Sequence, residues 1–252
     1  MADPQFGFFT PDKGFAKETE LFEKAIAHAN RLKPAFVIIC GDLVNTGADE
    51  DQNVELLRIC SLLDKNIPLY LLSGNHDVSS EEHLAYYRKN IGPDWYSFCN
   101  NGCYGIVLNS TIIKNQPDGV ESQKQFAWLR SELAKVADKK PAHIFVFMHH
   151  PIFVNDPNEE DSYNNLPTKQ RNSYLSLFSK YNVTAVFTGH NHENHLSRYG
   201  NMEIIITGPI GKPLGKDPSG FRVVKVYDNH IEHKYYSLDA VPENIKMQSN
   251  SN

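Results

Sequence analysis

The sequence predicts an α/β protein in which two sheets pack together and helices cover their outer faces. Segments with helical hydrophobic spacing alternate with short, continuous apolar runs along the first two thirds of the 252 residues. Such apolar runs are typical of strands that are covered on both faces. From residue 196 onward the helical pattern stops and short strand-like segments follow. This change indicates a second, mixed sheet, so the expected architecture is a two-sheet sandwich with helices outside.

The individual elements follow from local patterns. Apolar residues at helical spacing predict a first helix over 21–32, and the run AFVIIC at 35–40 predicts the first buried strand. Ser79 and Glu82 have the spacing of a capping box and predict a helix that continues to about Lys89. The remaining helices are expected at 51–63, 123–137 and 168–180, and the remaining strands at 67–72, 96–98, 104–109, 144–148, 183–188, 202–207, 221–227 and 231–237.

The chain shows no internal repeat and no linker, so residues 1–252 are expected to form one domain. The one long polar insertion is 155–170, and long loops in compact domains are often functional. Because this loop directly follows a candidate ligand, we expect it to overhang the site. Asp3 is expected to end a strand whose usual upstream half is missing, so the first strand is interpreted as truncated. No signal peptide is recognisable, which predicts a cytoplasmic location unless a targeting segment has been trimmed.

Composition excludes several classes of function. Lys and Arg number 25 against 30 Asp and Glu, a formal charge of −5, so there is no basic surface for a nucleic-acid backbone. No apolar run approaches the ~18 residues that a membrane span needs. The four cysteines have neither metal-knuckle spacing nor the pattern of a disulfide framework. We expect neither a nucleic-acid nor a membrane partner, and the oligomeric state stays open.

Polar side chains follow four of the predicted strands, at the point where each strand ends. The segments concerned are GDLVN at 41–45, GNHD at 74–77, HHP at 149–151 and GHNH at 189–192. In an open α/β sheet, ligands bind beyond the carboxyl ends of the strands. Asp, Asn and His are metal-ligand residue types. Each motif alone has a simpler explanation, such as a turn or a helix cap. To dismiss a metal site, the simpler explanation would have to be correct for all four motifs at once. The sequence therefore predicts a metal site.

The histidine pairs limit how such a site is built. His190 and His192 lie two residues apart, so on an extended backbone their side chains would face opposite ways. They converge only in a turn, which Gly189 would permit by freeing the backbone. His149 and His150 are adjacent, so one ring is expected to point inward and the other outward. At most one of these two is then a metal ligand.

The motifs GDLVN, GNHD, MHHP and GHNH, in this order, resemble those of the calcineurin-like metallophosphoesterases. The opening Asp3-Pro4-Gln5 is similar to a variant of the family's leading Asp-x-His. The DPQFG start and the tail IGKPLGKDPSGFRVV resemble a branch described as serine/threonine phosphatases, with bacterial relatives. The likeness spans nearly the whole chain. It implies a four-layer α/β/β/α sandwich of two mixed sheets flanked by helices, with two metal ions at one edge.

The resemblance also implies a role for each motif residue. Asp42 would bridge both ions. The further ligands of the first ion would be Asp3, His192 and Gln5, which stands where the family has histidine. The further ligands of the second ion would be Asn75, His149 and His190. His76 would contact the phosphate and protonate the leaving oxygen, and Asp77 would orient its imidazole.

Gln5 is the main departure from the family pattern, because an amide oxygen is a neutral and weaker ligand than imidazole. With Asn45 as a further candidate, three residues past Asp42, the first site would be rich in oxygen ligands. Such a set favours Mn²⁺, Fe²⁺ or Mg²⁺ over Zn²⁺. The expected cofactors are two divalent ions, Mn or Fe first, with Mg or Zn as alternatives. We expect the first site to hold its ion more loosely.

These residues predict a phosphatase that needs no protein base. Two divalent ions bring about +4 and two aspartates return −2, which leaves net positive charge to attract a phosphate dianion. A water bridging the ions would become the hydroxide nucleophile, and His76 would act as general acid. The acidic start of the 155–170 loop favours phosphomonoesters on small molecules or phosphoproteins. The alternatives are a phosphodiesterase acting on cyclic nucleotides or glycerophosphodiesters, and a catalytically weak binding scaffold.

Overall fold

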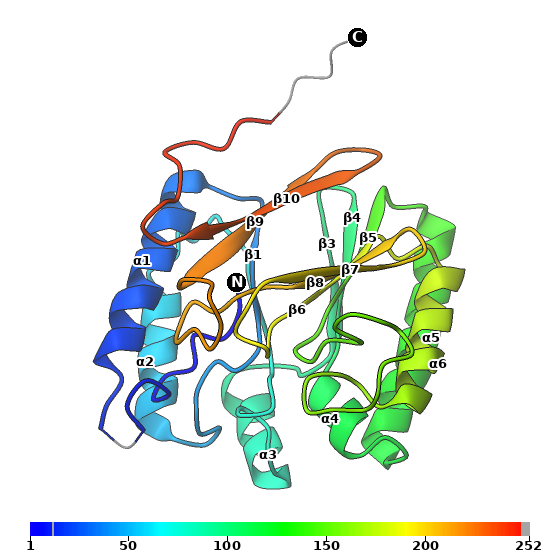
Figure 1. Cartoon of the computed structure of the whole chain (residues 1–252), viewed down its shortest axis with the longest axis horizontal. Helices are drawn as coiled ribbons and strands as arrows, with labels where there is room; N and C mark the ends of the chain where they lie inside the picture. The colour runs from blue at the N-terminus through cyan, green and yellow to red at the C-terminus, as the bar shows by residue number, and fades with distance from the viewer. Residues whose placement is uncertain (12, 248–252) are drawn as a thin grey trace.

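Two layers of strands lie face to face, one a six-stranded sheet and the other made of two two-stranded sheets, and helices lie on the outer sides (Figure 1). The computed structural model describes residues 1–11 and 13–247. The larger sheet has the strand order β3-β4-β5-β6-β8-β7, in which the inner strands are parallel and both edge strands are antiparallel. Its strands are β3 (Tyr96–Asn100), β4 (Cys103–Val107), β5 (His143–Phe147), β6 (Ala185–Thr188), β7 (His195–Tyr199) and β8 (Met202–Ile206).

The second layer consists of two strand pairs and an N-terminal segment that lies beside one of them. The strands β1 (Val37–Cys40) and β2 (Leu69–Leu72) are parallel, whereas β9 (Gly220–Val226) and β10 (Ile231–Ser237) form an antiparallel hairpin. The Cys40 N–H donates to Met1 O at 2.9 Å, and the Asp3 N–H donates to Gly41 O at 3.1 Å. On its other side, Ala2 O accepts the Ile210 N–H at 2.8 Å. These bonds fix Asp3 at the carboxyl end of β1.

The helices lie on the outer faces and at the loop-rich edge of the sandwich. Figure 1 shows α1 and α2 on one side, and α5 and α6 on the other. The six helices are α1 (Ala16–Leu32), α2 (Glu50–Cys60), α3 (Glu81–Asn90), α4 (Ser110–Asn115), α5 (Val120–Lys139) and α6 (Thr168–Lys180) within the described residues. None of these described helices is both long and apolar enough to cross a membrane.

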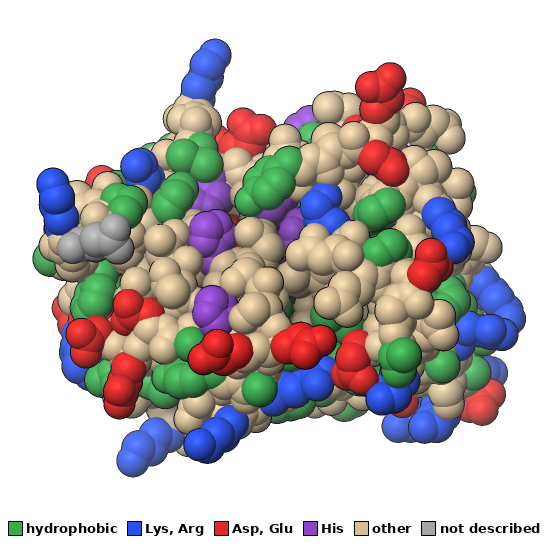
Figure 2. All heavy atoms as spheres, turned by 90° about the horizontal axis from the view of Figure 1, so that it is seen from below, with side chains coloured by type: hydrophobic (Ala, Val, Ile, Leu, Met, Phe, Trp, Pro, Cys, Tyr) green, Lys and Arg blue, Asp and Glu red, His purple; other side chains and the backbone are tan. Residues whose placement is uncertain are grey.

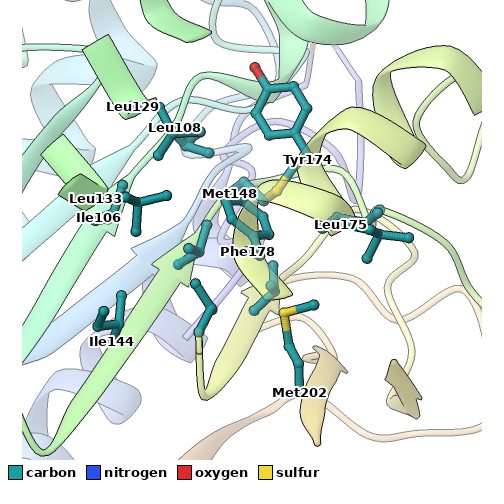
Figure 3. Packing of buried hydrophobic residues seen from close by; sticks show 14 of the residues in the cluster. Ile106, Leu108, Leu129, Leu133, Ile144, Met148, Tyr174, Leu175, Phe178 and Met202 are labelled. Carbon is teal, nitrogen blue, oxygen red and sulfur yellow. The ribbon is translucent and has the colours of Figure 1, made fainter. Parts of the chain in front are cut away.

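The two layers of strands and the two outer layers of helices are separated by three layers of buried apolar side chains. One layer joins α1 and α2 to β1, with Phe22 and Leu56 among its fully buried members. The layer under α5 and α6 contains Leu129 and Phe178 and is drawn in Figure 3. Burial of a side chain of this size contributes about 1.5–3 kcal/mol, so each helix pair is held by its apolar face.

The middle layer fills the space between the two sheets. It contains Leu72 from one sheet and Phe145, Phe147, Phe187 and Ile205 from the other. The continuous apolar runs of the central strands are explained by this packing, because both faces of each strand are covered. The predicted α/β/β/α sandwich of two sheets flanked by helices is confirmed.

Several element boundaries differ from the sequence prediction. The helix α1 begins at Ala16, and the N-cap of α3 is Ser80 and not Ser79. The Ser80 side chain accepts the His83 N–H at 3.1 Å, so the predicted Ser79–Glu82 pair is wrong. The short helix α4 and the edge strand β7 were not expected. Neither is long enough to show a hydrophobic period, and β7 pairs with one neighbour only.

Candidate metal centre

The predicted site residues gather where the strands end. Asp42 follows β1, Asn75 follows β2, His149 follows β5 and His190 follows β6. The N-terminal segment brings Asp3 to the same edge through its bonds to the end of β1. Figure 2 shows histidine side chains gathered on the face seen from below in the first view. Residues far apart in sequence therefore meet because parallel strands share their carboxyl edge.

Left-handed backbone recurs among these residues. The φ angle is positive at Asp3 (50°), Gln5 (41°), Asp42 (47°), His190 (73°) and His192 (54°). Residues other than glycine seldom adopt such angles, and each one costs on the order of 1–3 kcal/mol. The surrounding hydrogen bonds must offset that cost. Strain concentrated at one edge of the sheet is typical of a functional site.

Two glycines permit the close approach of carboxylates. A Cβ at Gly74 would overlap Asp42 Oδ1, and a Cβ at Gly189 would overlap Asp3 Oδ2. The φ angle of Gly189 is not left-handed, so the prediction that it frees the backbone for the turn is wrong. The turn is made by His190 and His192 themselves. Gly189 is required because Asp3 packs against it.

The candidate ligands form two clusters that share one carboxylate. The first cluster consists of Asp3, Gln5, Asp42 and His192, and the second consists of Asp42, Asn75, His149 and His190. In each cluster, the ligand atoms of the aspartates and histidines lie within 4.8 Å of one another. Asp42 belongs to both and is 2% exposed. A shared carboxylate between two adjacent groups is the arrangement that a pair of ions requires.

In the second cluster, one atom from each of three other residues lies close to His149 Nε2. His149 Nε2 lies 3.2 Å from Asp42 Oδ2, 3.2 Å from His190 Nδ1 and 3.2 Å from Asn75 Oδ1. Two imidazole nitrogens that face each other so closely need either a proton or a cation between them. The asparagine oxygen completes a set of neutral and anionic donors around the same point.

In the first cluster, Asp3 Oδ1 lies 3.6 Å from His192 Nε2. The Gln5 amide nitrogen donates to Asn45 Oδ1 at 3.3 Å, whereas Gln5 Oε1 is buried and has no hydrogen-bond partner. A buried acceptor without a partner costs about 1–3 kcal/mol unless something else binds it. The Asn45 carboxamide oxygen is occupied by Gln5, so Gln5 is the better placed of the two as an oxygen ligand.

Backbone carbonyls fix the tautomer of each candidate histidine ligand. His149 Nδ1 lies 2.8 Å from Cys40 O, and His192 Nδ1 lies 2.6 Å from Lys212 O. In His190 the other nitrogen is held, because Nε2 lies 2.9 Å from Tyr163 O. Each of these nitrogens donates its proton to a carbonyl, which leaves the opposite nitrogen free to face its cluster. Carbonyl partners of this kind orient metal-binding histidines in proteins.

Burial and mutual charge perturb the pKa values across both clusters. Burial opposes ionisation of Asp42, yet the charge of His149 and its hydrogen bond hold the pKa of Asp42 well below its usual range. Burial alone would lower the pKa of His149, but Asp42 and Asp3 raise it to about 9. Burial raises the pKa of Asp3 to about 6, against the charges of His192 and His149. Burial and the neighbouring His149 lower the pKa of His190 to about 3.

The donor sets fit two divalent cations. Carboxylate oxygens and imidazole nitrogens lie close together in both clusters, Asn75 Oδ1 joins the second, and Gln5 Oε1 is buried without a partner. Because two aspartates are buried beside three histidines, cations would relieve the cost of burying negative charge. The ligand sets would be Asp3, Gln5, Asp42 and His192 for one ion, and Asp42, Asn75, His149 and His190 for the other.

His76 lies beside the shared carboxylate. Its backbone N–H donates to Asp42 Oδ1 at 2.9 Å, and its Nδ1 lies 3.0 Å from Asn45 O. That carbonyl orients the imidazole and leaves Nε2 free. The prediction that Asp77 orients this ring is wrong. The Asp77 carboxylate instead accepts the backbone N–H groups of Leu43, Val44 and Gly74 at 2.7–3.1 Å.

Asp77 therefore acts on the loops and not on the imidazole. It joins the backbone just after Asp42 to the backbone just before Asn75. Burial and the nearby charge of Asp42 raise the pKa of Asp77 to about 7. Its buried oxygens hold two ligand-bearing loops in one position.

Only one of the two adjacent histidines faces the cluster, and the other ring is buried and not turned outward as predicted. His149 faces Asp42, whereas His150 Nδ1 lies 2.9 Å from the Ser110 hydroxyl. The same hydroxyl accepts the backbone N–H groups of both histidines. The His150 ring packs 4.4 Å from the ring of His190 and supports it. Ser110 begins α4, which explains why this unexpected helix lies at the edge of the site.

Three residues outside the two candidate ligand sets contact the histidines of the site. The Phe8 ring packs 5.3 Å from the ring of His192 and 6.3 Å from that of His76. Lys212 Nζ lies 5.2 Å above the Phe8 ring, while its carbonyl holds His192. Tyr163 contacts His190 through its ring and its carbonyl. No residue pattern distinguishes these contacts, because two are made by backbone carbonyls and the others by common apolar side chains.

Three acidic residues of the 155–170 loop accept hydrogen bonds from the loop itself. Glu159 accepts the N–H groups of three consecutive residues, 154–156, at 2.8–3.2 Å. Asp161 accepts both polar groups of Thr168, and Asp156 accepts the Asn158 N–H. The fully buried Arg171 donates to the carbonyls of the same loop. Asp156, Glu160 and Asp161 remain exposed, so the loop keeps negative charge at its surface.

Comparison with known proteins agrees with the fold and the clusters. The chain belongs to the calcineurin-like phosphoesterase family, which matches residues 2–194. It is 35% identical over 259 residues to the serine/threonine-protein phosphatase CPPED1 of Rattus norvegicus, covering 95% of this chain and 83% of that protein. It is 27% identical over 182 residues to the glycerophosphodiester phosphodiesterase GpdQ of Enterobacter lignolyticus, covering 69% of this chain and 62% of that protein.

Solved structures share the same fold. A dimetal phosphatase from Danio rerio superimposes with a TM-score of 0.65 at 15% identity, covering 94% of this chain and 95% of that chain. The family, the phosphatase relatives and the two ligand clusters together identify a metal-dependent phosphatase with a centre for divalent ions.

Proposed function

We propose that this chain hydrolyses phosphomonoesters, and that its substrate is a protein carrying phosphoserine or phosphothreonine. The observation that carries this proposal is the Asp42 carboxylate, which belongs to both ligand clusters and accepts the backbone N–H of His76 at 2.9 Å. This bond would hold His76, the proposed general acid, beside the two proposed ions. The relatives named serine/threonine phosphatases, at 35% identity, support a phosphoprotein as substrate.

Each residue of the site has a proposed role in the reaction. Two divalent ions, when bound, would supply positive charge for the phosphoryl oxygens and lower the pKa of an attacking water. With Nδ1–H held on Asn45 O, a doubly protonated His76 would transfer its Nε2 proton to the leaving oxygen and become neutral imidazole. Asp77 holds the loops that carry Asp42 and Asn75. Mn²⁺ or Fe²⁺ is the proposed metal, because the first cluster is rich in oxygen donors.

The first test is turnover of p-nitrophenyl phosphate with added Mn²⁺ and with a chelator, for the wild type beside His149→Ala. Activity should require metal and should fall at least a hundredfold in the variant, because His149 is central to the second cluster. His230→Ala is the matched control, since His230 is exposed on the β9–β10 turn. Metal-independent turnover, or an active His149→Ala protein, would contradict the proposal.

A phosphodiesterase is the second candidate, and the match to GpdQ over 69% of the chain favours it. The rates on p-nitrophenyl phosphate and on bis(p-nitrophenyl) phosphate separate the two activities. We expect the monoester to be preferred, and a preference for the diester would reverse the assignment. A phosphoserine peptide assayed beside its phosphotyrosine counterpart then tests the proposed substrate class, with the phosphoserine peptide expected to react faster.

A further inference from the structure

Tyr163 touches two members of the second cluster from the long polar loop. Its carbonyl oxygen lies 2.9 Å from His190 Nε2, and its ring centroid lies 4.6 Å from that of His190. Its hydroxyl oxygen accepts a hydrogen bond from Asn75 Nδ2 at 3.4 Å. One residue therefore contacts a nitrogen ligand and an oxygen ligand of the same cluster. The hydroxyl is the part of Tyr163 that no structural requirement explains.

The backbone around Tyr163 is fixed although the side chain is exposed. Lys114 Nζ donates to Ser162 O at 2.7 Å and to Asn165 O at 2.5 Å, on both sides of the tyrosine. The Asn165 side chain accepts the Ser162 N–H at 2.9 Å and donates to Glu159 Oε1 at 2.7 Å. These bonds give the loop one conformation. Preorganised groups of this kind act without the cost of ordering a mobile loop.

The Tyr163 hydroxyl has one hydrogen-bonding function left. A phenol offers one donor and also accepts, and Asn75 uses the acceptor. The O–H proton has no acceptor among the described residues, and the side chain is 64% exposed. The hydroxyl thus presents a donor to the solvent side of the second cluster, where a bound phosphate ester would lie.

We propose that the Tyr163 hydroxyl donates a hydrogen bond to a phosphoryl oxygen of the substrate. This inference rests on the proposed phosphatase function, since a phosphate ester must occupy the centre. No bond of Tyr163 breaks, and its proton stays on the phenol oxygen throughout. The donor acts on negative charge that grows on the phosphoryl oxygens in the transition state. Tyr163 is then a catalytic residue contributed by the loop, and Asn75 orients its hydroxyl.

The test compares Tyr163→Phe with the wild type in the Mn²⁺-loaded protein. Phenylalanine keeps the ring against His190 and keeps the carbonyl, and it removes only the hydroxyl. We expect kcat/KM on p-nitrophenyl phosphate to fall about 10- to 100-fold, the range for losing a hydrogen bond to a charged group. The dissociation constant of inorganic phosphate, measured by calorimetry, should rise. The bound Mn²⁺ content should not change. Tyr181→Phe, at the carboxyl end of α6, is the matched control and should behave as the wild type.

The results for Tyr163→Phe can be distinguished from a failure of the proposed phosphatase function. If the wild type hydrolyses no ester, the phosphatase proposal fails, and phosphate binding still decides the role of Tyr163. Unchanged kcat/KM and unchanged phosphate affinity in Tyr163→Phe would overturn the inference. A loss of rate that follows a loss of bound Mn²⁺, and that excess Mn²⁺ restores, would also overturn it. That result would limit the hydroxyl to holding Asn75.

Discussion

The two ligand clusters share Asp42 but are built differently. The second cluster stands on the ends of the central strands β5 and β6 and contains two histidines whose free nitrogens meet 3.2 Å apart. The first cluster depends on the N-terminal segment, where Asp3 and Gln5 both have left-handed backbone. It contains one histidine, and Gln5 contributes only a neutral oxygen. The second cluster has two imidazole donors against one in the first, so we expect the second ion to be the more tightly held.

The largest expected loss of activity comes from a substitution that disturbs both clusters at once. Gly74→Ala would place a methyl group against Asp42 Oδ1, so the shared carboxylate must move. Turnover should fall to the level of chelated enzyme, and neither ion should be retained. In Gly189→Ala the methyl group would overlap Asp3 of the first cluster, and it would come within 2.9 Å of Cys40 O, the carbonyl that holds His149, without overlapping a ligand of the second cluster.

Elemental analysis and thermal unfolding of both glycine variants would measure this difference. Gly189→Ala should retain the ion of the second cluster, whereas Gly74→Ala should retain none. If both variants lost the same ions while remaining folded, the two clusters would not be separable in the way described.

The second-largest expected difference between the two clusters is in the pH dependence of their metal affinity. The pKa of His149 is about 9 in the metal-free protein, so at pH 7 its ring carries a proton that an entering ion must displace. Affinity of the second cluster should therefore rise about tenfold per pH unit from pH 7 to 9 and then level off. The pKa of Asp3 is about 6, so affinity of the first cluster should fall only below pH 6.

Calorimetric titration with Mn²⁺ at pH 5.5, 7 and 8.5 would measure both trends. Repeating the pH 7 titration in buffers of different ionisation enthalpy counts the protons released. We expect about one proton for the second cluster, and its absence would show that His149 is already neutral.

The smallest expected effect is a gain. Gln5→His restores the residue type found at this position in the family motif and replaces a neutral oxygen by imidazole nitrogen. Affinity of the first cluster for Mn²⁺ should rise about tenfold, with a shift toward Zn²⁺. Unchanged affinity in calorimetry would mean that Gln5 Oε1 does not face the ion, although it is buried without a partner.

The sequence predicts the architecture well because burial on both faces leaves a clear pattern. The runs that became β1, β5 and β6 are mostly apolar, and a polar motif follows each one at the shared edge. The short helix α4 and the edge strand β7 could not be found in this way. A six-residue helix capped by Asn109 and an exposed edge strand carry too few buried positions to show a period.

The site was less predictable where one residue acts through another. Residue types and spacing bring the candidate ligands to one edge of the sheet, but they do not show which atoms hold them. Asp77 was expected to orient His76, yet the carbonyl of Asn45 holds that ring. Gly189 was expected to shape the turn, yet it makes room for Asp3. Backbone carbonyls and packing distances depend on the folded geometry and leave no mark in the sequence.

The shared carboxylate is the central claim, and metal stoichiometry tests it most directly. The wild type and Asp42→Asn would be equilibrated with Mn²⁺, dialysed, and measured by elemental analysis, with the His230→Ala protein alongside. We predict two ions per chain in the wild type and in His230→Ala, and fewer than one in Asp42→Asn. An Asp42→Asn protein that keeps as many ions as the wild type would contradict the claim that this residue joins the two clusters.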